Sequence, residues 1–162
     1  MTDTVPTETV DYIALRRLQN AYADIVSRRA FDELDTVFRP DTTLTIDLGS
    51  GGTRVFSGPA EIGRLIGDVV NPLDHFVFVI LNTIMRIGVD GDPDVAKARL
   101  YIWEIHSDAH TGRRSDLFGV YHDRHQRIED RWWFTERRYH RMARTGPGLD
   151  THGFPSAMND FV

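Results

Sequence analysis

A histidine stands at the start of one of the most apolar runs in the chain. His75 is followed by six apolar residues, "FVFVIL", and the run closes at Asn82. Imidazole changes its charge near neutral pH, so a histidine beside an apolar hollow can remove and return protons. The alternative is a ring that only caps a core strand. The pattern favours a proton-handling group at the floor of a pocket.

The spacing of the other histidines does not predict a metal site. His122 and His125 are three apart in a predicted strand, which directs them to opposite faces, and His106 and His110 flank a predicted turn. The chain has no cysteine, which excludes disulfides, thiolate ligands and thiol nucleophiles. No glycine-rich phosphate loop is present either. The sequence therefore predicts chemistry that needs neither a metal nor a cofactor.

Periodic patterns predict the elements that would position His75. Apolar residues at helical spacing and helix-start signals predict three helices, at residues 11–26, 32–38 and about 59–70. Alternating patterns predict a hairpin and then four longer strands, at residues 42–48, 53–56, 75–87, 95–106, 116–128 and 131–142, with a turn at 49–52 closing the hairpin.

This order of elements predicts an α+β fold. A long antiparallel sheet does not leave both faces apolar, so we expect the three N-terminal helices to pack across one face of a curved antiparallel sheet. A strongly curved sheet beneath helices leaves a hollow between the two layers. His75 starts the first long strand and is expected near that hollow.

Length and composition limit the classes of protein. The 162 residues suit a single domain, 1–162, with a core at about 10–142 and a C-terminal extension at 143–162. No apolar stretch is long enough to cross a bilayer, and the polar start of the chain has no secretion signal. A net charge of −5 argues against binding nucleic acid. We expect a cytoplasmic protein that binds neither membrane nor nucleic acid.

Five strings carry a family resemblance through their order and spacing, from about Val10 to Met142. They are "LQNAYADIVSRRAFDELDTVFRPDTTLTIDL", "FSGPAEI", "LDHFVF", "VDGDPDVAKARLYI" and "GVYHDRHQRIEDRWWFTERRY". Together they resemble the SnoaL-like branch of the NTF2-like superfamily, whose fold is cone-shaped. Its members include polyketide cyclases, scytalone dehydratase, a hexachlorocyclohexane dehydrochlorinase, ketosteroid isomerase and the small subunits of ring-hydroxylating dioxygenases. The resemblance implies a fold and a pocket more directly than a reaction.

The resemblance also implies roles for residues. His75 matches a histidine that acts as general base in the dehydratase and dehydrochlorinase, where a carboxylate near the end of the first helix stabilises its charge. This chain has Ser27 at the carboxylate's position, which accepts a hydrogen bond but does not stabilise an imidazolium. Asp24, three residues earlier on the same helix, and Asp47 are the two possible substitutes.

Two tyrosines complete the predicted site. Tyr22 matches a tyrosine of the isomerase that stabilises an oxyanion, and Tyr121 matches a strand position that faces the pocket in this family. We therefore predict His75, Asp24 and Tyr22 as catalytic residues. Tyr121, Ser27 and Asp47 are predicted to contact the substrate. Each has a structural alternative, from helix packing for Tyr22 to a solvated surface for Asp24.

The leading hypothesis is a cofactor-independent lyase or isomerase that acts on an apolar small molecule by histidine-based proton abstraction. One alternative is a non-catalytic small-molecule-binding protein. The other is an interaction subunit like the dioxygenase small subunit, which would use the seven arginines between Arg124 and Arg144 as a contact face. A homodimer or higher homo-oligomer through the outer face of the sheet is also expected by resemblance.

Overall fold

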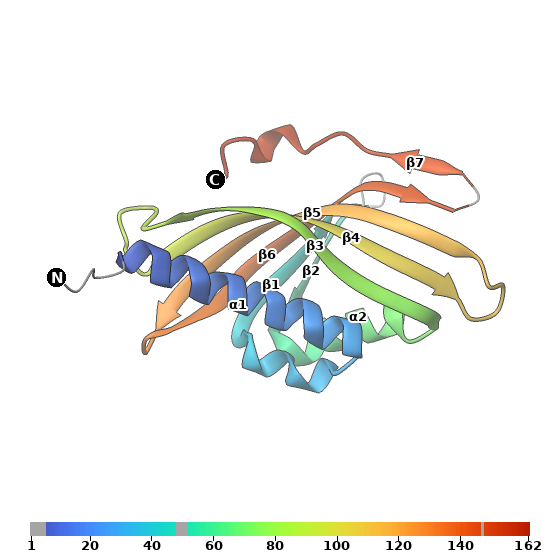
Figure 1. The fold of residues 1–162 in the computed structure, drawn as a ribbon, viewed down its shortest axis with the longest axis horizontal. Coiled ribbons are helices and arrows are strands. Elements are labelled where there is room, and N and C mark those ends of the chain that lie inside the picture. Colours follow the sequence, from blue (N-terminus) through green and yellow to red (C-terminus); the bar gives the residue numbers. More distant parts are fainter. Residues whose placement is uncertain (1–5, 48–51, 147) are drawn as a thin grey trace.

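The protein folds into one long, strongly curved sheet with helices on one side of it (Figure 1). The structure is a computed structural model that describes residues 6–47, 52–146 and 148–162. Its elements, in chain order, are α1 (Thr7–Arg28), a 3₁₀ helix (Phe31–Thr36), β1 (Phe38–Asp47), β2 (Thr53–Ser57), α2 (Gly58–Val70), β3 (Leu73–Ile87), β4 (Val95–Asp108), β5 (Arg114–Ile128), β6 (Arg131–Thr145), β7 (Leu149–Thr151) and a second 3₁₀ helix (Ser156–Met158). None of the described helices has the length and apolar character that a membrane span requires.

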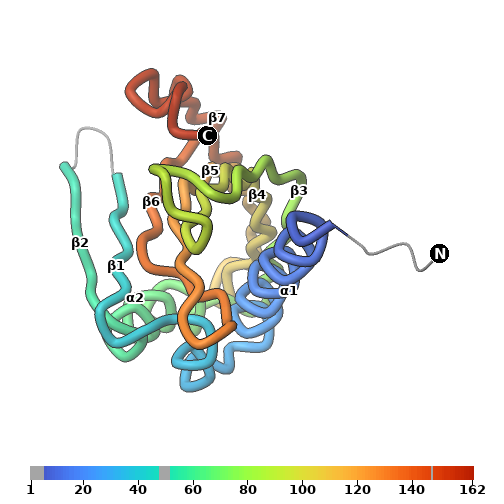
Figure 2. Tube along the Cα trace, turned by 90° about the vertical axis from the view of Figure 1, so that its left-hand side faces the viewer, coloured from blue at the N-terminus to red at the C-terminus, as the bar shows by residue number. Residues whose placement is uncertain are grey.

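The strands are ordered β2-β1-β6-β5-β4-β3, and β7 pairs with the end of β6. All the pairings are antiparallel except that of β1 with β6, which is parallel. Figure 2 looks along the arch of the sheet, with α1 and α2 beneath the arch and the C-terminal segment above it. The predicted α+β plan with a curved, largely antiparallel sheet is confirmed, apart from that parallel pairing and from the helices.

The prediction of three N-terminal helices is confirmed only for the first and the third of them. The described residues contain two α-helices, and residues 31–36 form only a short 3₁₀ helix, with bonds such as that from the Val37 amide to the Leu34 carbonyl at 3.2 Å. Pro40 favours extended backbone in the residue before it, which suits a strand and not the end of a helix at this point. Phe38 and Pro40 accordingly belong to β1. Leu48 and residues 49–51 of the predicted turn lie outside the described residues.

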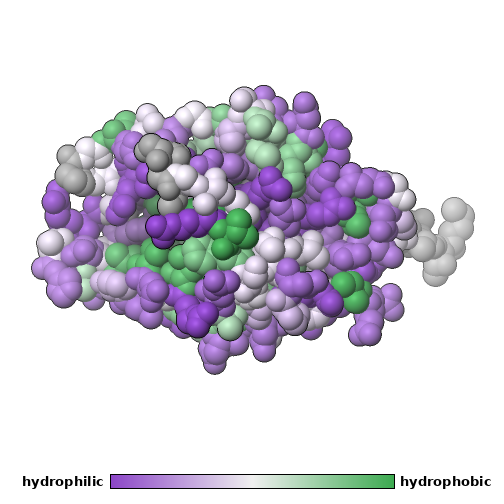
Figure 3. All heavy atoms as spheres, turned by 180° about the vertical axis from the view of Figure 1, so that it is seen from behind, coloured by the Kyte–Doolittle hydropathy of each residue, from purple (hydrophilic) through white to green (hydrophobic). Residues whose placement is uncertain are grey.

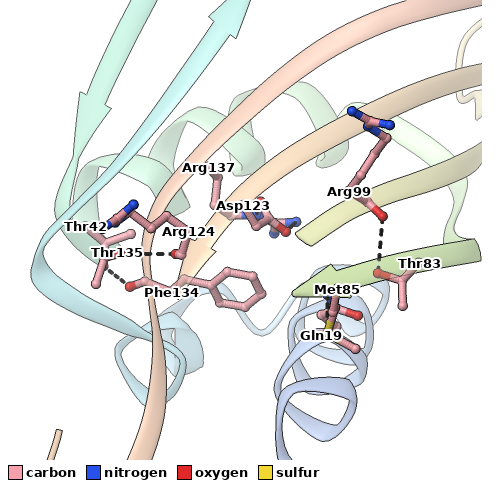
Figure 4. Close-up of polar contacts among 10 residues, drawn as sticks. All are labelled: Gln19, Thr42, Thr83, Met85, Arg99, Asp123, Arg124, Phe134, Thr135 and Arg137. Carbon is pink, nitrogen blue, oxygen red and sulfur yellow. Dashed lines mark hydrogen bonds and ion pairs between the residues drawn. The ribbon is translucent and has the colours of Figure 1, made fainter. Parts of the chain in front are cut away.

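Helix α1 buries one apolar stripe against the inner face of the sheet. Its buried residues include Leu15, Leu18, Tyr22 and Val26, which recur at helical spacing. Gln19 is also fully buried, and its amide nitrogen lies 3.9 Å from the sulfur of Met85 in β3 (Figure 4). The helix ends at Arg28, because Arg29 adopts the left-handed conformation that stops a helix.

A buried ion pair joins β5 and β6 behind the apolar core. Arg137 donates to Asp123 through Nε at 2.9 Å and Nη2 at 3.1 Å, and both side chains are buried (Figure 4). The guanidinium carbon of Arg137 lies 4.0 Å from the ring centres of both Tyr22 and Tyr121. The guanidinium of this pair therefore packs against both tyrosine rings, and its positive charge lies next to them.

The C-terminal segment folds back over the face of the sheet opposite the helices (Figures 1 and 2). Arg99 of β4 donates to the carbonyls of Met158 and Asn159 at 2.6 and 2.8 Å. The rings of Phe154 and Phe161 pack against His122, which is fully buried. The segment thus covers part of the outer surface of the sheet.

Candidate functional site

A cavity of about 380 Å³ lies between the inner face of the sheet and the two α-helices. Its walls are mainly apolar, formed by Val26, Leu44, Ile46, Phe56, Leu65, Ile66, Val69, Val70, Leu73, Phe76, Phe78 and Leu117. The polar lining consists of Tyr22, Asp47, Arg54, Glu104, His106, Tyr121, Tyr139, Arg141 and Arg144. Figure 3, which faces β2 and α2, shows a hollowed apolar area bordered by hydrophilic residues. A mostly apolar hollow with a few polar groups is the usual form of a small-molecule site.

A histidine and a carboxylate occur together on the β4 wall of this cavity. Glu104 and His106 are two residues apart, so the alternation of the strand places both on its inner face. Nε2 of His106 lies 3.1 Å from Oε2 of Glu104, and the exposed fractions of the two side chains are 7% and 15%. The His106 ring packs against Phe76, with ring centres 5.3 Å apart. Glu104 thereby orients the imidazole, and Nδ1 is the ring nitrogen left for a ligand.

Three tyrosines face the same space. Burial raises the pKa of Tyr22, Tyr121 and Tyr139, so each phenol stays protonated and can donate a hydrogen bond at neutral pH. The negative charge of Glu104 adds to the raised pKa of all three. The hydroxyl of Tyr139 is buried and has no hydrogen-bond partner among the described residues.

Gly119 makes room for Tyr139. A Cβ atom at Gly119 would overlap the Tyr139 ring, which lies against the glycine from the neighbouring strand β6. Tyr121, two residues along β5, contacts the same ring with centres 5.0 Å apart. The sheet therefore positions Tyr139 over a residue that has no side chain, and from there Tyr139 lines the cavity.

Of the six residues predicted for the site, Tyr22, Tyr121 and Asp47 line the cavity. Both tyrosines are buried, at 2% and 6% exposure, and their ring centres are 6.5 Å apart. Asp47 lies at the end of β1, with Oδ2 3.3 Å from Nδ1 of His140.

The predicted position of His75 in the pocket is wrong, because the residue is exposed and does not line the cavity. The pairing of β3 with β4 is irregular between Leu73 and His75, and from there Phe76 and Phe78 turn inward. Burial of two phenylalanine rings is more favourable than burial of an imidazole, so the strand adopts the register that exposes His75.

The other two predicted residues lie outside the cavity lining as well. Ser27 Oγ accepts a hydrogen bond from the amide of Phe78 at 3.1 Å, so an apolar residue of β3 lies where the histidine was expected. Asp24 is on the outer side of α1 and forms an ion pair with Arg28 at 2.7 Å. The resemblance predicted a histidine and a helix-1 carboxylate in contact, and here Phe78 and Ser27 are in contact instead.

Sequence reasoning missed the Glu104–His106 pair, Tyr139 and the arginines of the lining. A signal for the pair was present, since two polar residues at positions i and i+2 of a predicted strand share one face. Among the described residues, no group of three or more histidines and carboxylates is arranged to hold a metal ion.

The chain belongs to the SnoaL-like domain family, whose model matches residues 7–138. Among solved structures, it is similar to a scytalone dehydratase-like protein from Novosphingobium aromaticivorans, with a TM-score of 0.77 and 17% identity over 96% of this chain and 98% of that one. It is also similar to the hexachlorocyclohexane dehydrochlorinase LinA type 3 from Novosphingobium barchaimii, with a TM-score of 0.74 and 16% identity over 91% and 97% of the two chains. ActVI-ORFA from Streptomyces coelicolor has a TM-score of 0.65 and 15% identity over 80% and 96%. At these identities the likeness shows the shared fold. No curated protein matches the sequence significantly.

Proposed function

We propose that this protein is a cofactor-independent lyase or isomerase, with His106 as the proton-abstracting base. The observation that carries the proposal is the Glu104–His106 pair in the wall of a mostly apolar cavity, with 3.1 Å between the carboxylate oxygen and Nε2. With Nε2–H donating to Glu104, the lone pair on Nδ1 is free to accept a proton. The carboxylate then stabilises the imidazolium that forms.

The phenols supply the other half of the chemistry. When His106 removes a proton from a carbon next to a carbonyl, the electron pair of the broken C–H bond forms a C=C bond and the π pair of the carbonyl moves to its oxygen. Tyr139, whose buried hydroxyl has no described partner, and Tyr121 would donate hydrogen bonds to that oxygen. Return of the proton at another carbon completes an isomerisation, and expulsion of a leaving group from the adjacent carbon completes an elimination.

The family supports this reaction class through its fold. Two of the similar structures are named as a dehydrochlorinase and a scytalone dehydratase-like protein, and both names denote eliminations. An apolar molecule with a carbonyl or hydroxyl group suits the cavity, whose walls are apolar and whose phenols are protonated. We propose that the histidine has a different position in the sheet here than the resemblance implied.

A non-catalytic binding protein is the second candidate. Contact between Ser27 and the amide of Phe78 favours it, because this chain has no histidine and carboxylate at the place where the resemblance predicts them. In that case the cavity would hold its ligand without changing it. Glu104 and His106 would then serve as hydrogen-bonding groups only.

The role of an interaction subunit has less support, because the arginine-rich strands use most of their charges inside the chain. Arg124 pairs with Asp90, Arg127 with Asp11 and Asp94, Arg137 with Asp123, Arg138 with Glu136 and Arg141 with Asp150. A homo-oligomer formed through the outer face of the sheet stays part of the proposal. It would use the part of that face that residues 149–162 do not cover.

Binding and turnover measured on one panel of compounds separate the enzyme from the binding protein. Bicyclic and tricyclic ketones and alcohols would be screened by thermal shift, and every compound that binds would then be incubated and followed by mass spectrometry. We expect turnover of at least one compound. Turnover should fall about 10²–10⁴-fold in His106→Gln, the range of a positioned general base.

The matched control is His75→Gln, which changes an exposed histidine outside the cavity and should keep full turnover. Binding of several compounds without chemical change would favour the binding protein. Full turnover by His106→Gln would exclude His106 as the base.

A further inference from the structure

We propose that the ligand of this cavity is an acid: an apolar ring system with one carboxylate, which Arg141 binds inside the rim and Arg54 and Arg144 attract at the entrance. The inference rests on the proposed function only in taking the cavity as the ligand site. It concerns what the cavity binds and not whether His106 acts on it.

Arg141 has a hydrogen-bonding group that nothing in the described chain satisfies. Its Nη2 lies 3.3 Å from Asp150, which holds the side chain in place, but its Nε is buried and has no partner among the described residues. A buried donor without an acceptor is unfavourable, and a ligand oxygen at that point would remove the penalty. The buried hydroxyl of Tyr139, also in the lining, is a second donor in the same situation.

Arg54 and Arg144 add two positive charges to the same lining. Both are exposed, and neither forms an ion pair with a residue that the structure describes. Arg144 differs in this from Arg137, Arg138 and Arg141 of the same strand, each of which has an acidic partner. Two exposed cations of the lining that have no described ion pair raise the local concentration of anions.

The acidic residues of the cavity are already engaged. Glu104 contacts His106 at 3.1 Å, and Asp47 contacts His140 at 3.3 Å. Burial and then Glu104 raise the pKa of Tyr139, while the positive charges of Arg141 and Arg144, which line the same cavity, lower it. The lining therefore offers donors and positive charge near Tyr139, beside apolar walls, which is the complement of a carboxylate on an apolar body.

The test compares two probes of nearly equal size, 2-naphthoate and 2-naphthamide, by NMR titration at pH 7.5. We expect the protein to bind 2-naphthoate at least 10-fold more tightly than 2-naphthamide. The preference should disappear in Arg141→Met and fall when 0.5 M NaCl screens the charges. Arg138→Met, which removes one positive charge from the same strand but not from the cavity, should keep the preference.

A second variant provides an independent test in case Arg141→Met fails to fold after losing its contact with Asp150. The double change of Arg54→Met and Arg144→Met alters two exposed side chains without described ion pairs, and it should lower the affinity for 2-naphthoate at least 5-fold. Equal affinity of the wild-type protein for the acid and the amide would overturn the acid-binding inference and leave the proposed enzyme standing. No binding of either probe at 5 mM would count against the acid subsite and against the cavity as a ligand site.

Discussion

Glu104 holds the imidazole of His106 from a position two residues earlier on the same strand, with 3.1 Å between Oε2 and Nε2. Residues two apart on a strand have parallel side chains, so the pair needs no contribution from a helix or loop. The proposed base and its orienting carboxylate are thus fixed by the pleat of β4. In the arrangement implied by resemblance, a helix and a strand would each supply one member of the pair.

Glu104→Gln should separate orientation from charge. Glutamine can still accept the hydrogen bond of Nε2–H, but it does not stabilise an imidazolium, so we expect kcat to fall by about 10-fold or more with little change in KM. The measurement is steady-state kinetics on a compound that the protein turns over. An unchanged kcat would mean that the carboxylate has no part in the chemistry.

Gly119→Ala should disturb Tyr139 specifically. The added methyl group overlaps the Tyr139 ring, and such overpacking typically lowers the free energy of unfolding by about 1–3 kcal/mol. The loss should be smaller when Tyr139→Leu is introduced together with it, because the overlapping ring is then gone. Urea unfolding of the two single variants and the double variant measures this coupling. Fully additive losses would show that the glycine is not required by Tyr139.

Asp123→Asn should be strongly destabilising. It leaves Arg137 as an uncompensated charge that is 1% exposed, and loss of one partner of a buried pair typically costs about 3–5 kcal/mol. Glu136→Gln is the matched control, because its pair with Arg138 is partly exposed and should cost no more than about 1 kcal/mol. Equal midpoints of chemical unfolding for the two variants would show that the buried pair contributes no more to stability than the partly exposed one.

Acid should destabilise the protein through two buried histidines. Burial lowers the pKa of His125 to about 3 and that of His122 to about 4, with the charges of Arg137 and Arg99 as further causes. An unfolded histidine has a pKa of about 6.5, so between that pH and about 4 the unfolded chain binds more protons than the folded one. The free energy of unfolding should therefore fall as the pH drops through this range.

His125→Leu tests that assignment. Leucine does not titrate, so the variant should lose less stability between pH 6.5 and pH 4 than the wild-type protein does. Urea unfolding at a series of pH values measures how steeply the free energy of unfolding changes with pH. The same slope in both proteins would assign the acid sensitivity to other groups.

The helices and strands that depend on local sequence patterns were mostly predicted well, and contacts between strands were not. The apolar stripe of α1 and the alternation in β3 to β6 are local, so the helix, the strands and the curved sheet followed from them. Tyr22 and Tyr121 were expected in the pocket and do line it. Alternate residues of a strand point to opposite faces, so a shift of one residue in the pairing changes which residues point inward. The irregularity in pairing between Leu73 and His75 was not visible in the sequence. That one irregularity exposes His75 and buries Phe76, whose ring packs against His106 at a tilt.

Deuterium exchange into a cavity-bound ketone tests most directly whether His106 is the base. In D₂O, with 2-tetralone as the probe, ¹H NMR would follow the loss of the protons next to the carbonyl in the wild-type protein, in His106→Gln and in His75→Gln. We predict that the wild-type protein and His75→Gln accelerate the exchange to the same extent, and that His106→Gln leaves it at the rate of the buffer alone while still binding the ketone. Exchange by His106→Gln at the wild-type rate, or loss of the acceleration only in His75→Gln, would contradict the proposal.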